Sequence, residues 1–320
     1  MGWNPKAPKT FRDTTAVRTF KIPRDPAKGG GELSIHITEP DLKAQGLSLE
    51  TWAASSVQAG LIQRLTESQV TFPPDIITAY RGSDGDVAPP QHPQTIIPIL
   101  ELGAGTGMVG ISAAVKYGLS AVLTDLGPIA PGLAANAALN RDSLPGSGAE
   151  TPTMIFSGTL DWSQPADLSF YYSPPPESET ETEKEPPHDT TPTTAQRKNQ
   201  NPFEGTAEKA HLVLAADTIY SDEHPPLLAA TVLHWLRRDH PDARLVMCLP
   251  LRACYLEELR DLWQRLEAGG LECVEDGQEM ADQGVFDDEC LCEWSIWRWK
   301  RQDSEDEAEN ANANDDEKRD

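Results

Sequence analysis

Long apolar runs are missing from this sequence. In a chain of 320 residues, no apolar run approaches the roughly 20 residues that a membrane-spanning helix needs. The first residues, MGWNPKAPKTFRD, lack the apolar core of a secretory signal peptide. We therefore expect a protein that works in the cytoplasm and has no membrane attachment.

Positive charge is also scarce. The chain has 27 Lys and Arg residues against 51 Asp and Glu residues, which gives a formal net charge of −24. Direct nucleic-acid binding needs basic patches that neutralise phosphates, so this composition argues against it. An acidic surface instead attracts a basic partner or a substrate that carries lysine.

Cysteine is sparse and confined to the last third of the chain, with five residues in total. An odd number of cysteines without a secretion signal indicates reduced thiols. Cys290 and Cys292 alternate along a predicted strand, and no second Cys or His pair lies at ligand spacing. We therefore expect these thiols to pack in the core, and we expect no metal site.

The domain organisation follows from composition. Residues 173–200 have almost no large apolar side chains and many Pro, Glu and Thr. Such a segment cannot offset the entropy of ordering, so we predict a disordered insertion. We expect residues 1–16 and the acidic tail 303–320 to be disordered as well. One domain then spans 17–302 and opens with a β-hairpin within 17–45, where two strand patterns flank RDPAKGGG.

Between these segments, strand and helix patterns alternate. Strands are predicted at 95–102, 120–125, 153–162, 210–217 and 243–252, followed by a late pair at 270–276 and 290–300. Helices are predicted at 48–65, with Ser48 as N-cap, and at 107–117, 129–139, 225–239 and 254–269. This alternation predicts an α/β fold: a Rossmann-like, seven-stranded, mostly parallel sheet with helices on both faces and an antiparallel last strand. In such sheets ligands bind beyond the carboxyl ends of the strands, at the topological switch point.

A glycine-rich turn, LGAGTGMVG, follows the first of these strands directly. Glycines allow positive φ and let a cofactor approach the backbone. The spacing from Gly105 to Gly110 satisfies the dinucleotide pattern, so NAD is one candidate. Glu101 at the strand end favours a cofactor with a cationic amino-acid portion instead. Asp125 ends the next strand and could accept hydrogen bonds from ribose hydroxyls, which suits either cofactor. A structural turn without a ligand, and Asp125 as a helix cap, remain the plainer alternatives.

A second feature is DTIY, at the end of the strand predicted over 210–217. Asp217 could hold an incoming ammonium group, and Tyr220 would share a face with it if the first turn after the strand is helical. The plainer alternative makes Asp217 a helix N-cap and Tyr220 a packed aromatic.

In this order, TWAAS, ELGAGTGMVGI, TD, LDW and AADTIY resemble the seven-β-strand, S-adenosylmethionine-dependent lysine methyltransferases that modify chaperones and translation elongation factors. The resemblance covers roughly residues 45–260. The hairpin, the acidic insertion and the ending FDDECLCEWSIWRW are most similar to fungal elongation-factor methyltransferases.

The resemblance implies roles for the matched residues. Those implied at the cofactor are Trp52 over the pocket, Glu101, Gly103, Ala104 and Gly105 at the amino-acid portion, Asp125 at the ribose, Trp162 near the adenine and Ala216 on the fourth strand. Asp217 and Tyr220 would be the catalytic pair at the rim where a substrate lysine enters.

We therefore expect a monomeric, S-adenosylmethionine-dependent protein-lysine N-methyltransferase whose substrate is a translation elongation factor. Two alternatives stay open: a methyltransferase for a small amine or another side chain, and a catalytically idle adaptor with the same fold. An NAD-dependent oxidoreductase is disfavoured, because no Tyr-x-x-x-Lys spacing or paired His/Asp arrangement supports hydride chemistry.

Overall fold

The computed structural model describes residues 16–26, 29–39, 43–44, 47–48, 50–81, 96–146, 153–171, 208–286 and 290–301. The three segments expected to be disordered (1–16, except Ala16, 173–200 and 303–320) lie outside the described residues.

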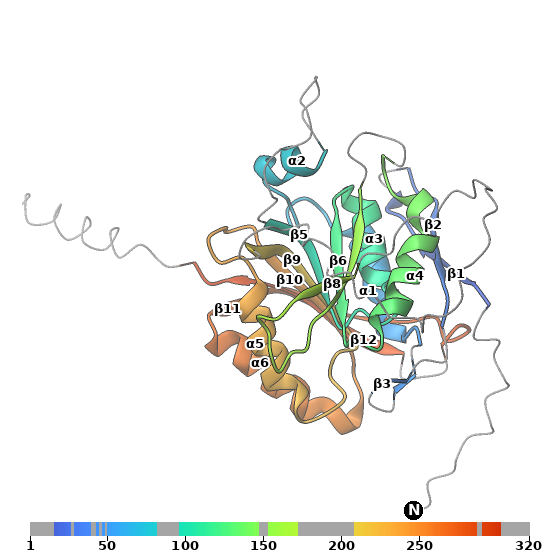
Figure 1. Ribbon diagram of the computed structural model, residues 1–320. Helices are drawn as coiled ribbons and strands as arrows, with labels where there is room; N and C mark the ends of the chain where they lie inside the picture. Colours follow the sequence, from blue (N-terminus) through green and yellow to red (C-terminus); the bar gives the residue numbers. More distant parts are fainter. Residues whose placement is uncertain are drawn as a thin grey trace, which may run out of the picture.

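The centre of the molecule is one twisted sheet (Figure 1), whose eight strands lie in the order β11-β12-β10-β9-β5-β6-β7-β8. Its strands are β5 (Ile96–Leu102), β6 (Ala121–Asp125), β7 (Ile155–Thr159), β8 (Ser169–Tyr171), β9 (Glu208–Ala216), β10 (Arg244–Pro250), β11 (Leu271–Met280) and β12 (Leu291–Trp299). The five strands from β10 to β7 in this order are parallel, while β8, β11 and β12 pair antiparallel.

Helices cover both faces of the sheet (Figure 1). One layer contains α1 (Ala53–Arg64), α3 (Met108–Tyr117) and α4 (Ala130–Leu139), and the other contains α5 (His224–Trp235) and α6 (Leu256–Ala268). The central parallel strands β5 and β10 are buried along almost their whole length because both faces are covered. The predicted fold class is confirmed.

Several short elements were not predicted. They are β3 (Lys43–Ala44), β4 (Leu47–Ser48), α2 (Pro74–Arg81) and the edge strand β8. The prediction of Ser48 as a helix N-cap is wrong: Ser48 belongs to β4, and α1 begins at Ala53 with Trp52 at the N-cap position. The three strands have only two or three residues each, which is too short to show a periodic pattern.

The predicted hairpin consists of β1 (Arg18–Pro23) and β2 (Glu32–Ile37), which pair antiparallel. Two asparagines one turn apart, Asn136 in α4 and Asn140 at its C-cap, hold the hairpin by hydrogen bonds. Asn140 accepts a hydrogen bond from the His36 amide at 2.8 Å, and Asn136 accepts one from the Thr38 amide at 2.8 Å. Asn136 also donates to the carbonyl of Thr106 in the glycine-rich turn, at 3.1 Å. These bonds join the hairpin to the turn through α4.

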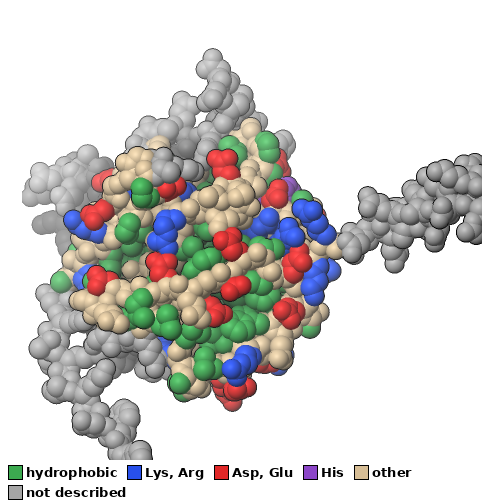
Figure 2. Space-filling view, turned by 180° about the vertical axis from the view of Figure 1, so that it is seen from behind, with side chains coloured by type: hydrophobic (Ala, Val, Ile, Leu, Met, Phe, Trp, Pro, Cys, Tyr) green, Lys and Arg blue, Asp and Glu red, His purple; other side chains and the backbone are tan. Residues whose placement is uncertain are grey.

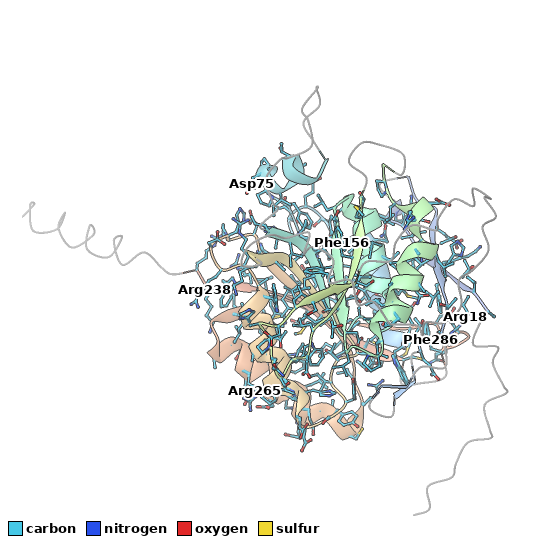
Figure 3. The ribbon with its side chains drawn as sticks, viewed as in Figure 1. Arg18, Asp75, Phe156, Arg238, Arg265 and Phe286 are labelled. Atoms are coloured by element: carbon cyan, nitrogen blue, oxygen red, sulfur yellow. The ribbon has the colours of Figure 1, made fainter. Side chains whose placement is uncertain are left out.

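Aromatic packing closes the far side of the hairpin. Phe286, labelled in Figure 3, stacks on Phe20 of β1 with ring centroids 6.3 Å apart. The guanidinium of Arg18 lies over the same Phe20 ring at 4.7 Å and pairs with Glu39 at 2.6 Å. The hairpin is therefore anchored on both of its sides.

The surface opposite the view of Figure 1 carries charges of both signs among hydrophobic side chains (Figure 2). Within the described ranges, no helix has the length and apolar character needed to cross a membrane.

The order of the strands fixes where a ligand can bind. From β5 the chain moves outward through β6, β7 and β8, and it then returns to place β9 against the other side of β5. The connections after β5 and β9 therefore run in opposite directions and leave a crevice at the carboxyl ends of these two strands.

A buried histidine makes stability depend on pH. His211 in β9 is almost fully buried, and its Nε2 lies 2.8 Å from the carbonyl oxygen of Thr71. Its Nδ1 has no hydrogen-bond partner. Burial lowers the pKa of His211 from 6.5 to about 4, with Arg237 and His240 adding to this and the Thr71 carbonyl and Asp242 opposing it.

The unfolded chain, with a His pKa near 6.5, therefore binds a proton more readily than the folded chain between pH 6.5 and pH 4. Stability falls as the pH falls through this window, and we expect a loss of about 2 kcal/mol from His211 between pH 7 and pH 5. Urea unfolding at both pH values measures this loss. His211→Gln retains a donor at the Nε2 position without titrating, so it should lose less stability over the same interval. Equal losses in the two proteins would mean that His211 does not carry the effect.

Candidate cofactor and acceptor site

A pocket opens at the carboxyl ends of β5, β6, β7 and β9, where the strand order places the crevice. The described residues that line it are Gly103, Asp125, Leu126, Leu160, Asp161, Trp162, Asp217, Thr218, Tyr220, His224 and Leu227. Five of the ten predicted site residues are among them: Gly103, Asp125, Trp162, Asp217 and Tyr220.

The glycine-rich turn forms one wall of the pocket. Gly103, Gly105 and Gly107 all have positive φ, at 62°, 53° and 83°. A Cβ on Gly103 would lie 3.1 Å from the indole of Trp162 and 3.2 Å from the methyl group of Thr218. Only glycine therefore allows both the conformation and the close approach at this position. Ala104 follows with its side chain buried, and its amide donates to the carbonyl of Thr124 at 2.9 Å.

Asp125 is held rigidly at the end of β6. Its Oδ2 accepts a hydrogen bond from the Gly105 amide at 2.8 Å, and its Oδ1 accepts one from the Leu126 amide at 2.7 Å. Burial raises the pKa of Asp125, and the two amide bonds oppose that shift. Each oxygen uses one lone pair on the backbone and keeps another, so the carboxylate can also accept hydrogen bonds from a ligand in the pocket.

Glu101 lies behind the turn rather than among the described residues that line the pocket. Its side chain is buried, and its Oε2 accepts a hydrogen bond from the Gly110 amide of α3 at 2.8 Å. Burial raises the pKa of Glu101 to about 8; the Gly110 bond opposes this shift, and the charge of Asp125 adds to it. In this position Glu101 holds the first turn of α3, which directly follows the glycine-rich turn.

Asp217 has an unusual backbone conformation. It is the single non-glycine residue with positive φ in the described part of the chain, at 52°. Such a conformation costs energy and persists only where the surroundings hold it. Here the Asp217 amide donates to the carbonyl of Cys248 at 3.0 Å, and the carboxylate forms a two-pronged ion pair with Arg252.

Arg252 comes from the segment just after β10 and was not predicted as a site residue. Its two terminal nitrogens lie 2.5 and 2.8 Å from the two carboxylate oxygens of Asp217. The side chains are 14% and 4% exposed, so the pair is largely shielded from water. Trp52 joins the group from the other side, since the Arg252 guanidinium lies 5.9 Å from its ring centroid. Trp52 is therefore linked to Asp217 through Arg252 and is not among the described residues that line the pocket.

Tyr220 also lies on the pocket wall, but not for the reason that was predicted. Residues 218–220 are not helical, and α5 begins only at His224 with Glu223 as its N-cap. Both the shared helical face and the alternative of Asp217 as an N-cap are wrong. The left-handed turn at Asp217 brings Tyr220 to the pocket instead. Burial raises the pKa of Tyr220 to about 12, together with the charges of Asp125 and Asp217. Ala216 lies buried just before the turn.

Two further residues of the wall were missed. The hydroxyl of Thr218 is buried and has no hydrogen-bond partner, although the residue lines the pocket. His224 packs edge-on against both Trp162 and Tyr220, with centroid distances of 5.9 and 4.2 Å. The pocket combines a glycine turn beside an indole ring with two polar groups, the unpaired Thr218 hydroxyl and the fixed Asp125 carboxylate. Such a lining suits a ligand that has both a flat apolar part and hydroxyl groups. The adenosine portion of S-adenosylmethionine fits this description.

Comparison with known proteins finds relatives among lysine methyltransferases. Residues 32–172 match the family model described as lysine methyltransferase. The chain is 26% identical to the protein-lysine N-methyltransferase EFM2 of Saccharomyces cerevisiae over 261 residues, which is 79% of this chain and 48% of that protein. It is 27% identical to the protein-lysine N-methyltransferase rrg1 of Schizosaccharomyces pombe over 204 residues, 63% of this chain and 54% of that protein. The predicted resemblance to lysine methyltransferases is confirmed.

The chain thus spans about half the length of the curated relatives it matches. A solved S-adenosylmethionine-dependent methyltransferase from Methanosarcina mazei aligns with 64% of this chain and 93% of its own at 13% identity, with a TM-score of 0.39. That likeness is too low to support an argument about function.

Proposed function

We propose that this chain, whose residues 32–172 match the lysine methyltransferase family, transfers a methyl group from S-adenosylmethionine to a lysine of another protein. The proposal rests on one observation: the residues proposed for the cofactor and those proposed for the lysine line the same pocket. Gly103 and Asp125 belong to the first group, and Asp217 and Tyr220 belong to the second. We further propose that the substrate is a translation elongation factor, as the sequence resemblance implies. We also propose that the enzyme is a monomer and meets this substrate in the cytoplasm.

On the cofactor side, Gly103 lines the pocket without a side chain to fill it, and Asp125 offers acceptors for the ribose hydroxyls. Trp162 covers the turn and can stack on a flat base. Bound here, the cofactor would supply an activated methyl group on its sulfonium. The task of the chain is then to bring an amine into line with that group.

The acceptor must arrive as a free amine. A lysine side chain has a pKa near 10.4, so removing its proton at pH 7 costs roughly 4–5 kcal/mol. A bare carboxylate would make this harder because it stabilises the ammonium form. The Asp217 carboxylate is paired with Arg252, so this ion pair adds little net charge where the amine would enter. The carboxylate can still orient the amine through its remaining lone pairs, while the neighbouring guanidinium disfavours the ammonium form.

Replacing Asp217 with asparagine is therefore expected to reduce methyl transfer by about 10²-fold, because the amine loses its alignment. Cofactor affinity should stay within several-fold of the wild type. A radiolabelled-methyl assay on a fungal lysate, followed by mass spectrometry of the labelled proteins, measures transfer, and calorimetry with S-adenosylmethionine measures binding.

Other outcomes point to the other functions. Label that appears only in small metabolites would favour the alternative of a small-amine methyltransferase. Cofactor binding without any labelling would favour an idle adaptor. Binding of NAD without binding of S-adenosylmethionine would overturn the proposal. If Asp217→Asn transfers at the wild-type rate, the role given to Asp217 is wrong.

A further inference from the structure

His224 is placed where it can control Tyr220. It begins α5 and lies between two aromatic residues of the pocket wall, with Tyr220 at 4.2 Å and Trp162 at 5.9 Å between ring centroids. Both rings meet the imidazole nearly at right angles, at 89° and 81°. Its Nδ1 also accepts a hydrogen bond from the Tyr220 backbone amide at 3.3 Å.

We propose that His224 is a positioning residue for Tyr220: the Nδ1 lone pair fixes the Tyr220 backbone, and the ring edge fixes the phenol. The inference rests on the proposed function, in which Tyr220 walls the acceptor channel. The segment from Thr218 to Glu223 has no regular secondary structure of its own. A side-chain acceptor at the start of the next helix is therefore well placed to hold its amide.

The bond requires a neutral imidazole, because a protonated ring has donors on both nitrogens and no lone pair at Nδ1. Burial lowers the pKa of His224, and the Thr218 carbonyl, Glu223 and Asp222 oppose the shift. The charged groups that face His224 across the pocket are Asp125, Asp161 and Asp217, the last of them paired with Arg252. The ring is thus neutral at pH 7, and acid protonates it and releases Tyr220.

Two replacements test whether the acceptor at Nδ1 is what positions Tyr220. Asparagine places its carbonyl oxygen near the position of Nδ1, whereas glutamine places its polar atoms near Nε2, so only asparagine retains the acceptor for Tyr220. His224→Asn should keep kcat/KM within about 3-fold of the wild type, and His224→Gln should lose about 10-fold, the upper value of one neutral hydrogen bond. Cofactor affinity should change by the same factor in both, because both variants lose the ring that packs against Trp162. Equal losses in the two variants would overturn positioning through Nδ1, because only His224→Asn keeps an acceptor for the Tyr220 amide.

A second measurement does not depend on activity. The backbone amide resonance of Tyr220 in the wild type should shift as the pH falls through the pKa of His224, below 6.5. The same resonance in His224→Asn should stay near its neutral-pH position and should not titrate with His224. A wild-type chemical shift of the Tyr220 amide that stays constant through this titration would overturn the inference. If the wild type transfers no methyl group to any acceptor, the proposed function fails, and this titration still decides whether His224 positions Tyr220.

Discussion

Replacing Arg252 with leucine is expected to cost about 3–5 kcal/mol of unfolding free energy, because it removes the ion-pair partner of a buried carboxylate. Asp217 is 4% exposed and is held in a left-handed conformation. Arg252 donates a hydrogen bond to each carboxylate oxygen of Asp217, and its guanidinium lies over the ring of Trp52. One substitution therefore removes two hydrogen bonds and one cation–π contact. Against a total stability of about 5–15 kcal/mol this loss is large. Urea unfolding at pH 7 measures it.

The chain offers a matched control on its surface. Arg260 pairs with Glu257 one turn away on α6, with side chains 56% and 85% exposed. Because exposed pairs contribute about 0–1 kcal/mol, Arg260→Leu should have little effect. The double variant Asp217→Asn/Arg252→Leu should recover part of the loss, since no buried charge is then left without its partner. A cost for Arg252→Leu no greater than that for Arg260→Leu would contradict the assignment.

Replacing Asp125 with alanine is expected to weaken binding of S-adenosylmethionine by about 10- to 100-fold, which is the range for hydrogen bonds to a charged group. The reason is twofold. The variant loses the acceptors proposed for the ribose. The Gly105 amide also loses its hydrogen bond to Oδ2, so the glycine-rich turn is held less firmly. Isothermal calorimetry measures the dissociation constant.

Asp161 is the control for this substitution. It lines the same pocket, but its side chain is exposed and accepts a hydrogen bond from the Ser163 amide at 2.9 Å. Asp161→Ala removes the same charge from the pocket without touching the turn, and we expect a change below about 3-fold. Equal effects in the two variants would mean that general charge, rather than the fixed carboxylate of Asp125, attracts the cofactor.

Much of the site could be predicted because strand ends are easy to locate in sequence. Asp125 ends a parallel strand, and Gly103, Trp162 and Asp217 each follow one closely. The carboxyl ends of parallel strands meet at one edge of the sheet. Arg252 also follows such a strand, β10, so the same rule could have found it. A basic residue after a strand is common on protein surfaces, and nothing local showed that its partner lies 35 residues earlier.

The remainder depends on conformations that sequence patterns do not show. Aspartate tolerates positive φ but does not require it, so the left-handed turn at Asp217 could not be anticipated. That turn decides which way Thr218 and Tyr220 face. It also separates β9 from α5, which is why the helical spacing assumed between Asp217 and Tyr220 was wrong. His224 was not predicted as a pocket residue, because a histidine followed by two prolines is typical of an ordinary helix start.

The hydrogen bonds of Asn136 and Asn140 have a consequence for local unfolding of the chain. The amides of His36 and Thr38 find their acceptors 104 and 98 residues further along the chain. They stay shielded from solvent exchange only while α4 is folded. Through Asn136 the same opening frees the carbonyl of Thr106. The N-terminal hairpin, α4 and the glycine-rich turn therefore belong to one cooperative unit, whose slowest hydrogen exchange reports on all three together.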